Sequence, residues 1–215
     1  MKQKDVFLQS EGDAWFQRNT AGSSAAGISD ADPLLGEILD LRPRPARNAK
    51  ILEIGCGDGA RLQRLSAELG CECHGIDPSA RAVAAARARG VTAVQGTADQ
   101  LPFADRMFEI VIFGFCLYVC DRADLFRLAY EADRVLLNPG WLLIHDFYSP
   151  APIKRAYHHR PGLFCHKMDF RSMFTWHPAY TTYTHKIRGH VLGDYTDVAG
   201  QWVATSVLRK LPDGV

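Results

Sequence analysis

The residues best suited by type and spacing to do chemistry are Glu53 and the glycines at positions 55, 57 and 59. An aliphatic run, residues 51–54, surrounds the acid, and a helical pattern begins at Ala60. Glycine adopts backbone angles that other residues avoid, and it leaves no Cβ between the backbone and a ligand. The segment therefore predicts a buried strand, a glycine turn and a helix N-terminus on which a nucleotide-like molecule can lie. The spacing differs from the dinucleotide fingerprint Gly-x-Gly-x-x-Gly.

Two further acids follow short apolar segments. Asp77 ends residues 73–77, and Pro78 and Ser79 then begin an alanine-rich helix that Gly90 closes. In sheets of this type, an acid at the end of the second strand binds ribose hydroxyls. Asp99 follows a third, β-branched segment. The sequence therefore predicts a site for a ribose-containing molecule.

These motifs resemble those of class I S-adenosylmethionine (SAM) methyltransferases, and their pattern is most similar to the small UbiE-like methyltransferase domain. The resemblance covers residues 50–148, about half of the 215-residue chain, and departs from the family where Trp141 stands in place of a second glycine. It implies SAM as cofactor, S-adenosylhomocysteine as product, and Asp99 as acceptor for the adenine amino group. The implied cofactor-binding residues are Trp15, Arg18, Asn19, Glu53, Gly55, Cys56, Gly57, Asp77, Pro78, Ala98, Asp99, Gln100 and Phe115.

Apolar strands alternate with amphipathic helices along this region, which predicts a parallel sheet covered on both faces. We expect an α/β, Rossmann-like fold: seven strands, mostly parallel, with an antiparallel last strand, the last two strands forming an antiparallel hairpin at the edge of the sheet. The expected strands are residues 51–54, 73–77, 91–96, 108–113, 141–147, 180–187 and 202–208, and residues 125–136 form a helix. The alternative is a doubly wound domain that binds another nucleotide or none.

We expect residues 1–48 to form a helical lid and residues 49–215 to form the SAM-binding domain. Trp15, Arg18 and Asn19 fall on about one helical turn, in a segment that resembles one lying over the cofactor in bacterial methyltransferases of sugar and natural-product pathways. The alternative is an amphipathic helix that simply docks through Trp15. Residues 21–27 are small and suit a hinge. Residues 34–41 predict a short helix.

Residues 149–180 are rich in His, Tyr, Phe and Met, and we expect this insertion to build the acceptor site. An oxygen or nitrogen acceptor needs a base whose pKa lies near the working pH. His145 is the preferred candidate, with Asp146, His158, His159 and His166 also possible, and Tyr118 is expected to orient the acceptor. His145 can equally be a hydrogen-bonded strand-end residue, and His158 and His159 can belong to a solvated loop.

Composition narrows the class of protein. The net charge of +1 gives no electrostatic reason to expect nucleic acid or an anionic membrane as partner, and no apolar run approaches the roughly 20 residues of a membrane span. We expect a cytoplasmic protein, because most of the six cysteines have the sequence context of buried thiols. Cys71-Glu-Cys73-His74 has the wrong spacing for a zinc site, so no metal is expected.

The sequence therefore predicts a SAM-dependent methyltransferase that acts on an oxygen or nitrogen of a polar small molecule. The alternatives are a peptide or protein methyltransferase and a non-catalytic SAM-binding partner subunit. The acceptor and the oligomeric state are not predicted.

Overall fold

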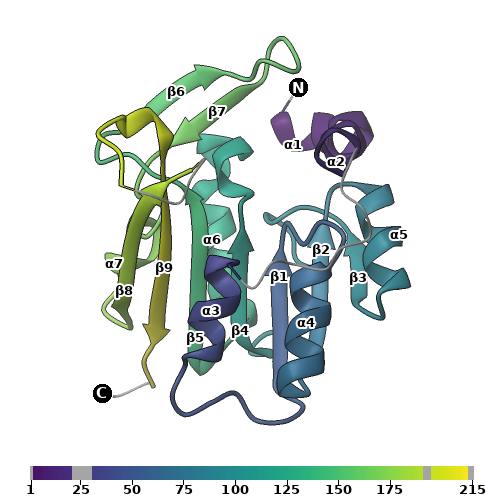
Figure 1. Ribbon diagram of the computed structural model, residues 1–215, viewed down its shortest axis with the longest axis vertical. Coiled ribbons are helices and arrows are strands. Elements are labelled where there is room, and N and C mark those ends of the chain that lie inside the picture. The colour runs from purple at the N-terminus through teal and green to yellow at the C-terminus, as the bar shows by residue number, and fades with distance from the viewer. Residues whose placement is uncertain (1, 21–30, 191–194, 213–215) are drawn as a thin grey trace.

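A seven-stranded sheet forms the centre of the computed structural model, which describes residues 2–20, 31–190 and 195–212. Its order is β3-β2-β1-β4-β5-β9-β8 (Figure 1). The strands are β1 (Lys50–Ile54), β2 (Glu72–Asp77), β3 (Thr92–Gln95), β4 (Phe108–Gly114), β5 (Leu136–Phe147), β8 (Tyr180–Gly189) and β9 (Trp202–Lys210). Strands β1 to β5 pair in parallel, and β9 lies antiparallel between β5 and β8. The predicted fold is confirmed.

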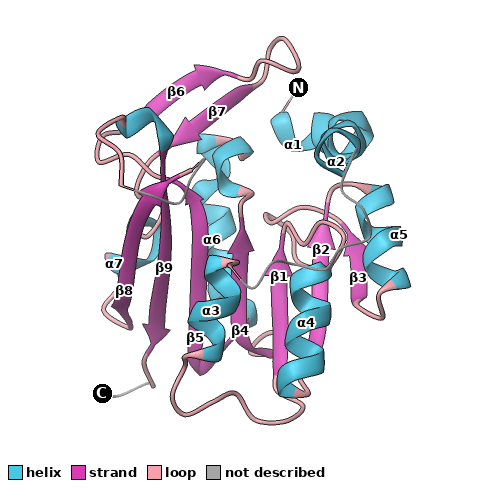
Figure 2. Ribbon diagram, viewed as in Figure 1, coloured by secondary structure: helices cyan, strands magenta, loops and turns pink. Residues whose placement is uncertain are grey.

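Helices cover both faces of this sheet (Figure 2). Apolar residues of α3 (Pro33–Leu39), α4 (Ala60–Leu69) and α5 (Ala80–Ala88) share one buried cluster with Ile110 and Ile112 of β4. Those of α6 (Leu125–Val135) and α7 (Ser172–Thr175) share the other with Val111 and Phe113. Successive side chains of a strand point to opposite faces, so an unbroken apolar run is what a sheet buried on both sides requires.

Two segments stand beyond the carboxyl ends of the parallel strands (Figure 1). One comprises α1 (Gln3–Val6), the π-helix η1 (Phe7–Glu11) and α2 (Gly12–Thr20). The other is an antiparallel hairpin, β6 (Ile153–Ala156) and β7 (Phe164–Lys167), which lies within the predicted insertion. The sequence analysis did not predict its strands. The predicted hinge, residues 21–27, lies outside the described residues.

Helix α3 packs on the face of the sheet and is not part of the segment that lies over the strand ends. It packs against β5 and β9, and its residues Leu34, Leu35 and Ile38 are buried in the core. Of the predicted lid, residues 1–48, the described parts that lie over the strand ends are therefore α1, η1 and α2.

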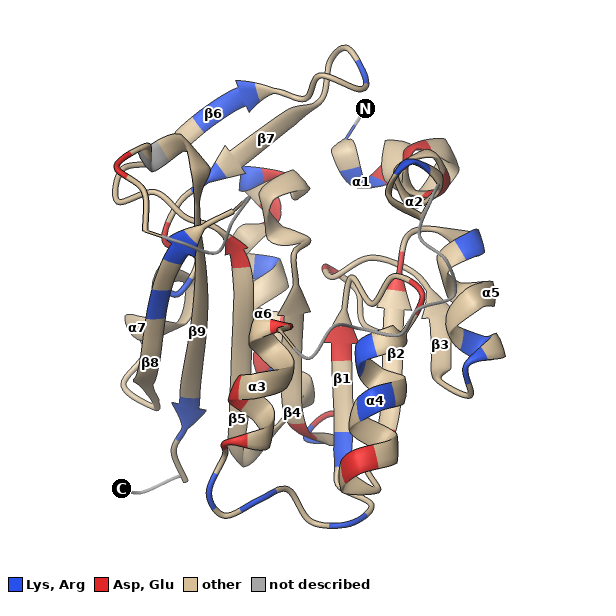
Figure 3. Ribbon diagram, viewed as in Figure 1, with Lys and Arg blue, Asp and Glu red and all other residues tan. Residues whose placement is uncertain are grey.

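Acidic residues gather near the carboxyl ends of β1, β2 and β5 (Figure 3), where the sequence places Glu53, Asp77 and Asp146. Short 3-10 helices follow β4, namely η2 (Leu117–Val119) and η3 (Arg122–Asp124), and η4 (Ala199–Gln201) precedes β9. Within the described ranges, no helix has the length and apolarity needed to cross a bilayer.

Candidate functional site: a cavity at the carboxyl ends of the strands

Two cavities open beside the ends of β1, β2 and β4. The larger, of about 220 Å³, lies between the glycine turn and α2. The smaller, of about 80 Å³, extends to the loop after β3. Phe7, Gly55, Pro78, Cys116 and Val119 line both cavities, so the two lie next to each other. Its position agrees with the rule that open α/β sheets bind ligands beyond their carboxyl strand ends.

The glycine turn after β1 has the backbone that the sequence predicts. Gly55 has φ +77°, and a Cβ there would lie 2.6 Å from the Cβ of Cys116. Gly57 has φ +53°, and a Cβ there would meet no atom within 4 Å. Both residues line the larger cavity. The absence of a side chain at Gly55 therefore lets the turn pack closely against Cys116, and the absence of one at Gly57 leaves open space in the cavity.

Asp77 connects this turn to the end of β2. Its carboxylate accepts hydrogen bonds from the backbone N–H of Gly57 at 3.0 Å and of Ser79 at 2.8 Å. Burial raises the pKa of Asp77, although both hydrogen bonds oppose the shift. The side chain lines the larger cavity, as its predicted role in binding ribose hydroxyls requires.

Glu53 lies at the end of β1 and is only 1% exposed. Arg61 of α4 donates a hydrogen bond to it, and the same guanidinium donates two to Asp32, at 3.0 and 2.8 Å. The Oε2 atom of Glu53 has no hydrogen-bond partner among the described residues, and Glu53 lines the larger cavity. A buried acceptor without a partner is costly, so this oxygen suits a ligand that carries a donor, such as the amino group of SAM.

Asp99 lines the smaller cavity together with Ala98, whereas Gln100 is exposed and lines neither cavity. Thr97 donates a hydrogen bond to one oxygen of Asp99 at 2.6 Å, and Lys4 donates one to the other. Burial acts to raise the pKa of Asp99, but these hydrogen bonds and the Lys4 charge lower it overall. The carboxylate is therefore ionised and ready to accept from a ligand.

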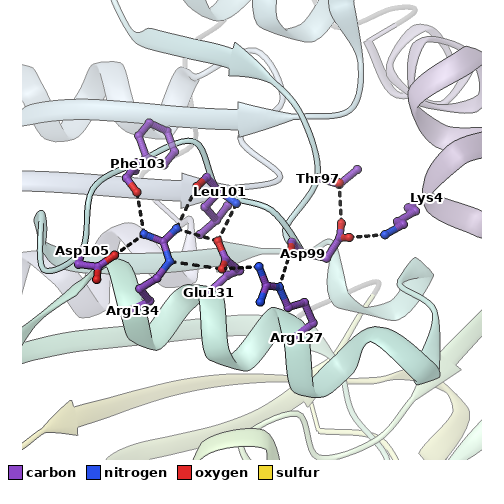
Figure 4. A network of polar contacts seen from close by, with 9 residues as sticks. All are labelled: Lys4, Thr97, Asp99, Leu101, Phe103, Asp105, Arg127, Glu131 and Arg134. Carbon is purple, nitrogen blue, oxygen red and sulfur yellow. Dashed lines mark hydrogen bonds and ion pairs between the residues drawn. The ribbon is translucent and has the colours of Figure 1, made fainter.

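Helix α6 holds the loop that carries Asp99 (Figure 4). Buried Glu131 accepts from the backbone N–H of Leu101 at 2.9 Å, and Arg134 donates to the carbonyls of Leu101 and Phe103. Arg127 donates to the carbonyl of Asp99 at 3.1 Å. The sequence analysis missed this network, because it joins residues about thirty positions apart.

Helix α2 is docked on the site through two residues. Trp15 lines the larger cavity and donates its indole N–H to the Tyr118 hydroxyl at 3.0 Å. Asp13 accepts from the Ser79 hydroxyl at 2.6 Å and from the backbone N–H of Arg81 at 3.1 Å, at the beginning of α5. The aromatic side chain thus closes one wall of the cavity.

Arg18 and Asn19 are predicted cofactor-binding residues that line neither cavity. Arg18 donates to the hydroxyl of Tyr157 at 2.9 Å and also pairs with Glu11. Asn19 donates to the carbonyl of Trp15 at 2.8 Å. Both residues therefore support α2 in this conformation.

Aromatic side chains after β4 form a further wall of the larger cavity, next to Trp15. Phe115 follows β4 with φ +62°, an unusual value for a bulky residue, which is a backbone conformation concentrated at functional sites. Its ring centroid lies 4.9 Å from that of Phe147, 5.6 Å from Tyr118 and 5.3 Å from His190. Phe115 and Tyr118 line the cavity, so this wall is where an acceptor molecule can pack. The sequence analysis missed Phe147 and His190.

Asp146 is buried and holds the loop behind this wall. Its carboxylate accepts from the backbone N–H of Leu117 at 2.7 Å and of Tyr118 at 3.3 Å. Burial raises the pKa of Asp146 to about 7. The side chain thus faces the backbone of η2 and lines neither cavity, which is the arrangement of a residue that positions Tyr118.

The histidines that the sequence analysis selected as bases lie in different environments. His145 Nδ1 is 2.8 Å from Thr205 Oγ1, and the ring is 5.3 Å from that of Phe115. His158 and His159 are exposed on the turn between β6 and β7. His166 of β7 is buried, and its Nδ1 atom has no hydrogen-bond partner among the described residues. None of the four histidines lines the cavities, and of the four only His145 contacts the aromatic wall.

We expect His145 to remain neutral at physiological pH, because burial and the charge of Arg61 lower its pKa to about 4. Protonation is then easier in the unfolded chain, so this residue should reduce stability as the pH falls from roughly 6.5 to about 4. Histidine NMR titration checks the pKa, and thermal unfolding of His145→Gln checks the stability. A His145 signal that titrates near 6.5 would contradict the prediction.

Comparisons with known proteins agree with this geometry. Residues 51–140 match the methyltransferase domain family. These residues, which make up less than half of the chain, therefore resemble a methyltransferase domain. An uncharacterized protein of Mycobacterium tuberculosis is 36% identical over 135 residues, which span 61% of this chain and 41% of that protein. The matched part of the chain thus covers less than half of this curated relative.

Solved structures show the same fold at low identity. The 1,6-didemethyltoxoflavin-N1-methyltransferase of Burkholderia thailandensis, solved with S-adenosylhomocysteine and 1,6-didemethyltoxoflavin, has a TM-score of 0.69 at 16% identity, covering 97% of this chain and 87% of that one. A chain from the complex of a Haloferax volcanii methyltransferase activator with a methyltransferase has a TM-score of 0.72 at 18% identity, covering 97% and 99%. Both likenesses show that this chain shares their fold.

Proposed function

We propose that this protein transfers a methyl group from SAM to an oxygen or nitrogen of a polar small molecule. The observation that carries the proposal is the pair of adjacent cavities. The acids Glu53 and Asp77 and the open glycine backbone, which suit SAM, line the larger cavity together with Phe115 and Tyr118 of the aromatic wall, and Asp99 lines the smaller one. Donor and acceptor molecules can then lie next to each other, as methyl transfer requires.

Each part of the cavity has a proposed role toward the cofactor. Asp77 binds the ribose hydroxyls, Asp99 accepts from the adenine amino group, and the free oxygen of Glu53 accepts from the amino group of the methionine part. When bound, SAM supplies an activated methyl group, so the protein mainly has to position the acceptor and exclude water. Trp15 excludes water by closing the cavity over the glycine turn.

On the acceptor side, the acceptor molecule packs against the ring of Phe115, and Tyr118 orients it. The lowered pKa keeps the His145 imidazole neutral at physiological pH, but it also makes that imidazole a weaker base than an ordinary histidine. His145 is the proposed base for an acceptor that must lose a proton because its ring contacts Phe115 of the aromatic wall. His158 and His159 are the proposed alternatives, although they need the β6–β7 hairpin to move toward the cavity.

Two other functions use the same fold, namely methylation of a peptide or protein and a non-catalytic SAM-binding subunit. The cavity favours a small molecule, because its larger part, which Trp15 and Phe7 line, has a volume of only about 220 Å³. The Burkholderia thailandensis enzyme named above acts on a small molecule. We also propose that the protein has no nucleic-acid partner, since the net charge is +1, and that it is cytoplasmic, since its six cysteines are free thiols.

The test is methyl transfer from SAM labelled in its methyl group. The purified chain is incubated with hydroxyl- and amino-bearing metabolites, sugar nucleotides, phenolic natural products and a peptide library. We expect the label in a small molecule, with Asp77→Ala as the cofactor-deficient control. Label in peptides alone would favour the protein-directed function. Binding of S-adenosylhomocysteine without transfer to any class would favour the non-catalytic one.

A further inference from the structure

Helix α1 borders the smaller cavity through Lys4, and the following turn borders it through Phe7. Gln3 anchors this helix and is only 5% exposed. Its backbone N–H donates to Asp121 at 2.7 Å, and its side chain donates to the carbonyl of Val119 at 2.8 Å. The position of Lys4 at the cavity is therefore fixed by its neighbour.

The Lys4 ammonium group lies between two acids. It donates a hydrogen bond to Asp99 (Figure 4), and it is 3.7 Å from the Oδ2 atom of Asp124. That oxygen is buried and has no hydrogen-bond partner among the described residues. An ammonium group has three donors, so Lys4 keeps at least one donor for a further acceptor. At this wall of the cavity, a donor from α1 thus stands next to the acceptor of Asp99.

This pair of groups is complementary to one edge of adenine. The 6-amino group of adenine is a donor, and the neighbouring ring atom N1 is an acceptor. With Asp99 facing the 6-position and Lys4 facing N1, a 6-oxopurine presents the wrong group to each, because its oxygen accepts and its N1–H donates. Enzymes distinguish bases by hydrogen bonds to such edges. A buried donor or acceptor that is left without a partner strongly reduces the affinity.

We infer that Lys4 is a cofactor-binding residue which, together with Asp99, selects adenine over a 6-oxopurine. The inference rests on the proposed cofactor site and adds to it a residue outside the matched methyltransferase domain. It also gives α1 a function, since docking of this helix completes the adenine pocket.

The test is calorimetric titration of the full chain with S-adenosylhomocysteine and with its deaminated analogue, S-inosylhomocysteine. The wild type should bind the adenosyl compound more tightly. Lys4→Met should weaken that binding roughly fivefold and reduce the preference over the inosyl compound, because the donor to N1 is lost. Lys4→Arg retains a charged donor and should restore most of the preference.

Lys2→Met is the matched control. Lys2 also pairs with Asp124, at 2.7 Å, but it lines neither cavity, so both affinities should stay at the wild-type value. If Lys4→Met binds S-adenosylhomocysteine as tightly as the wild type or more tightly, Lys4 competes with the cofactor for Asp99 and the inference is wrong. A wild type that binds neither compound would instead overturn the cofactor site itself.

Discussion

Replacing Arg61 by methionine is expected to lower the free energy of unfolding by about 3–5 kcal/mol, the usual cost of removing one partner from a buried ion pair. Arg61 donates to both Glu53 and Asp32, and its side chain is only 15% exposed. Without the guanidinium, two carboxylates face each other across the end of β1 with no cation between them. Chemical denaturation followed by circular dichroism measures the loss.

Arg64→Met is the matched control on the same helix. Arg64 pairs with Glu68 one turn along α4 at the surface, and such pairs contribute roughly 0–1 kcal/mol. Equal losses for Arg61→Met and Arg64→Met would contradict the account of the buried pair.

The cost of Arg61→Met should also depend on pH. Burial raises the pKa of Glu53, and removing the arginine should raise it further. When the pKa of a carboxyl group is higher in the folded chain than in the unfolded chain, the unfolded chain ionises first as the pH rises. The free energy of unfolding therefore falls with rising pH. The variant should therefore be less stable at pH 8 than at pH 5, and adding Glu53→Gln should remove most of this dependence.

Asp77→Ala is expected to weaken SAM binding at least tenfold while the chain stays folded. Hydrogen bonds to a charged group contribute roughly 1.5–3 kcal/mol each, and tenfold corresponds to about 1.4 kcal/mol. The substitution also removes the acceptor for the backbone N–H of Gly57, so the turn that supports the cofactor loses its connection to β2. Calorimetric titration with SAM measures the change.

Glu72→Ala, at the other end of β2, controls for damage to the strand. Glu72 is exposed and lies far from the cavity lining, so this variant should bind SAM like the wild type. A folded Asp77→Ala with unchanged affinity would show that Asp77 does not bind the cofactor.

Local patterns made most of the sheet predictable. Residues 51–54 and 108–113 are apolar except for Glu53 and Glu109, and each segment forms a strand buried on both faces. The glycine turn was predictable because its backbone depends on residues adjacent in sequence, and Ser79 caps α5 as the Pro-Ser signal indicates.

The parts that sequence reasoning missed depend on contacts between distant segments. Lys4 reaches Asp99 across 95 positions, and Arg61 reaches Asp32 across 29. Nothing in the local pattern around Lys4 distinguishes it from a surface lysine. Arg61 offered a weak signal, because it begins a helix directly beside a buried acid. Asp146 resembled a catalytic acid at a strand end, and only the fold shows its carboxylate bound to the backbone of η2.

The most direct measurement for the central claim is a calorimetric titration of the purified chain with S-adenosylhomocysteine and, separately, with NAD. The spacing of Gly55, Gly57 and Gly59, the open space above Gly57 and the acids Asp77 and Asp99 all suit a single nucleoside. We predict binding of S-adenosylhomocysteine with a dissociation constant on the order of micromolar, and no binding of NAD. Heat of binding from NAD, with none from S-adenosylhomocysteine, would contradict the assignment of this cavity as a SAM site.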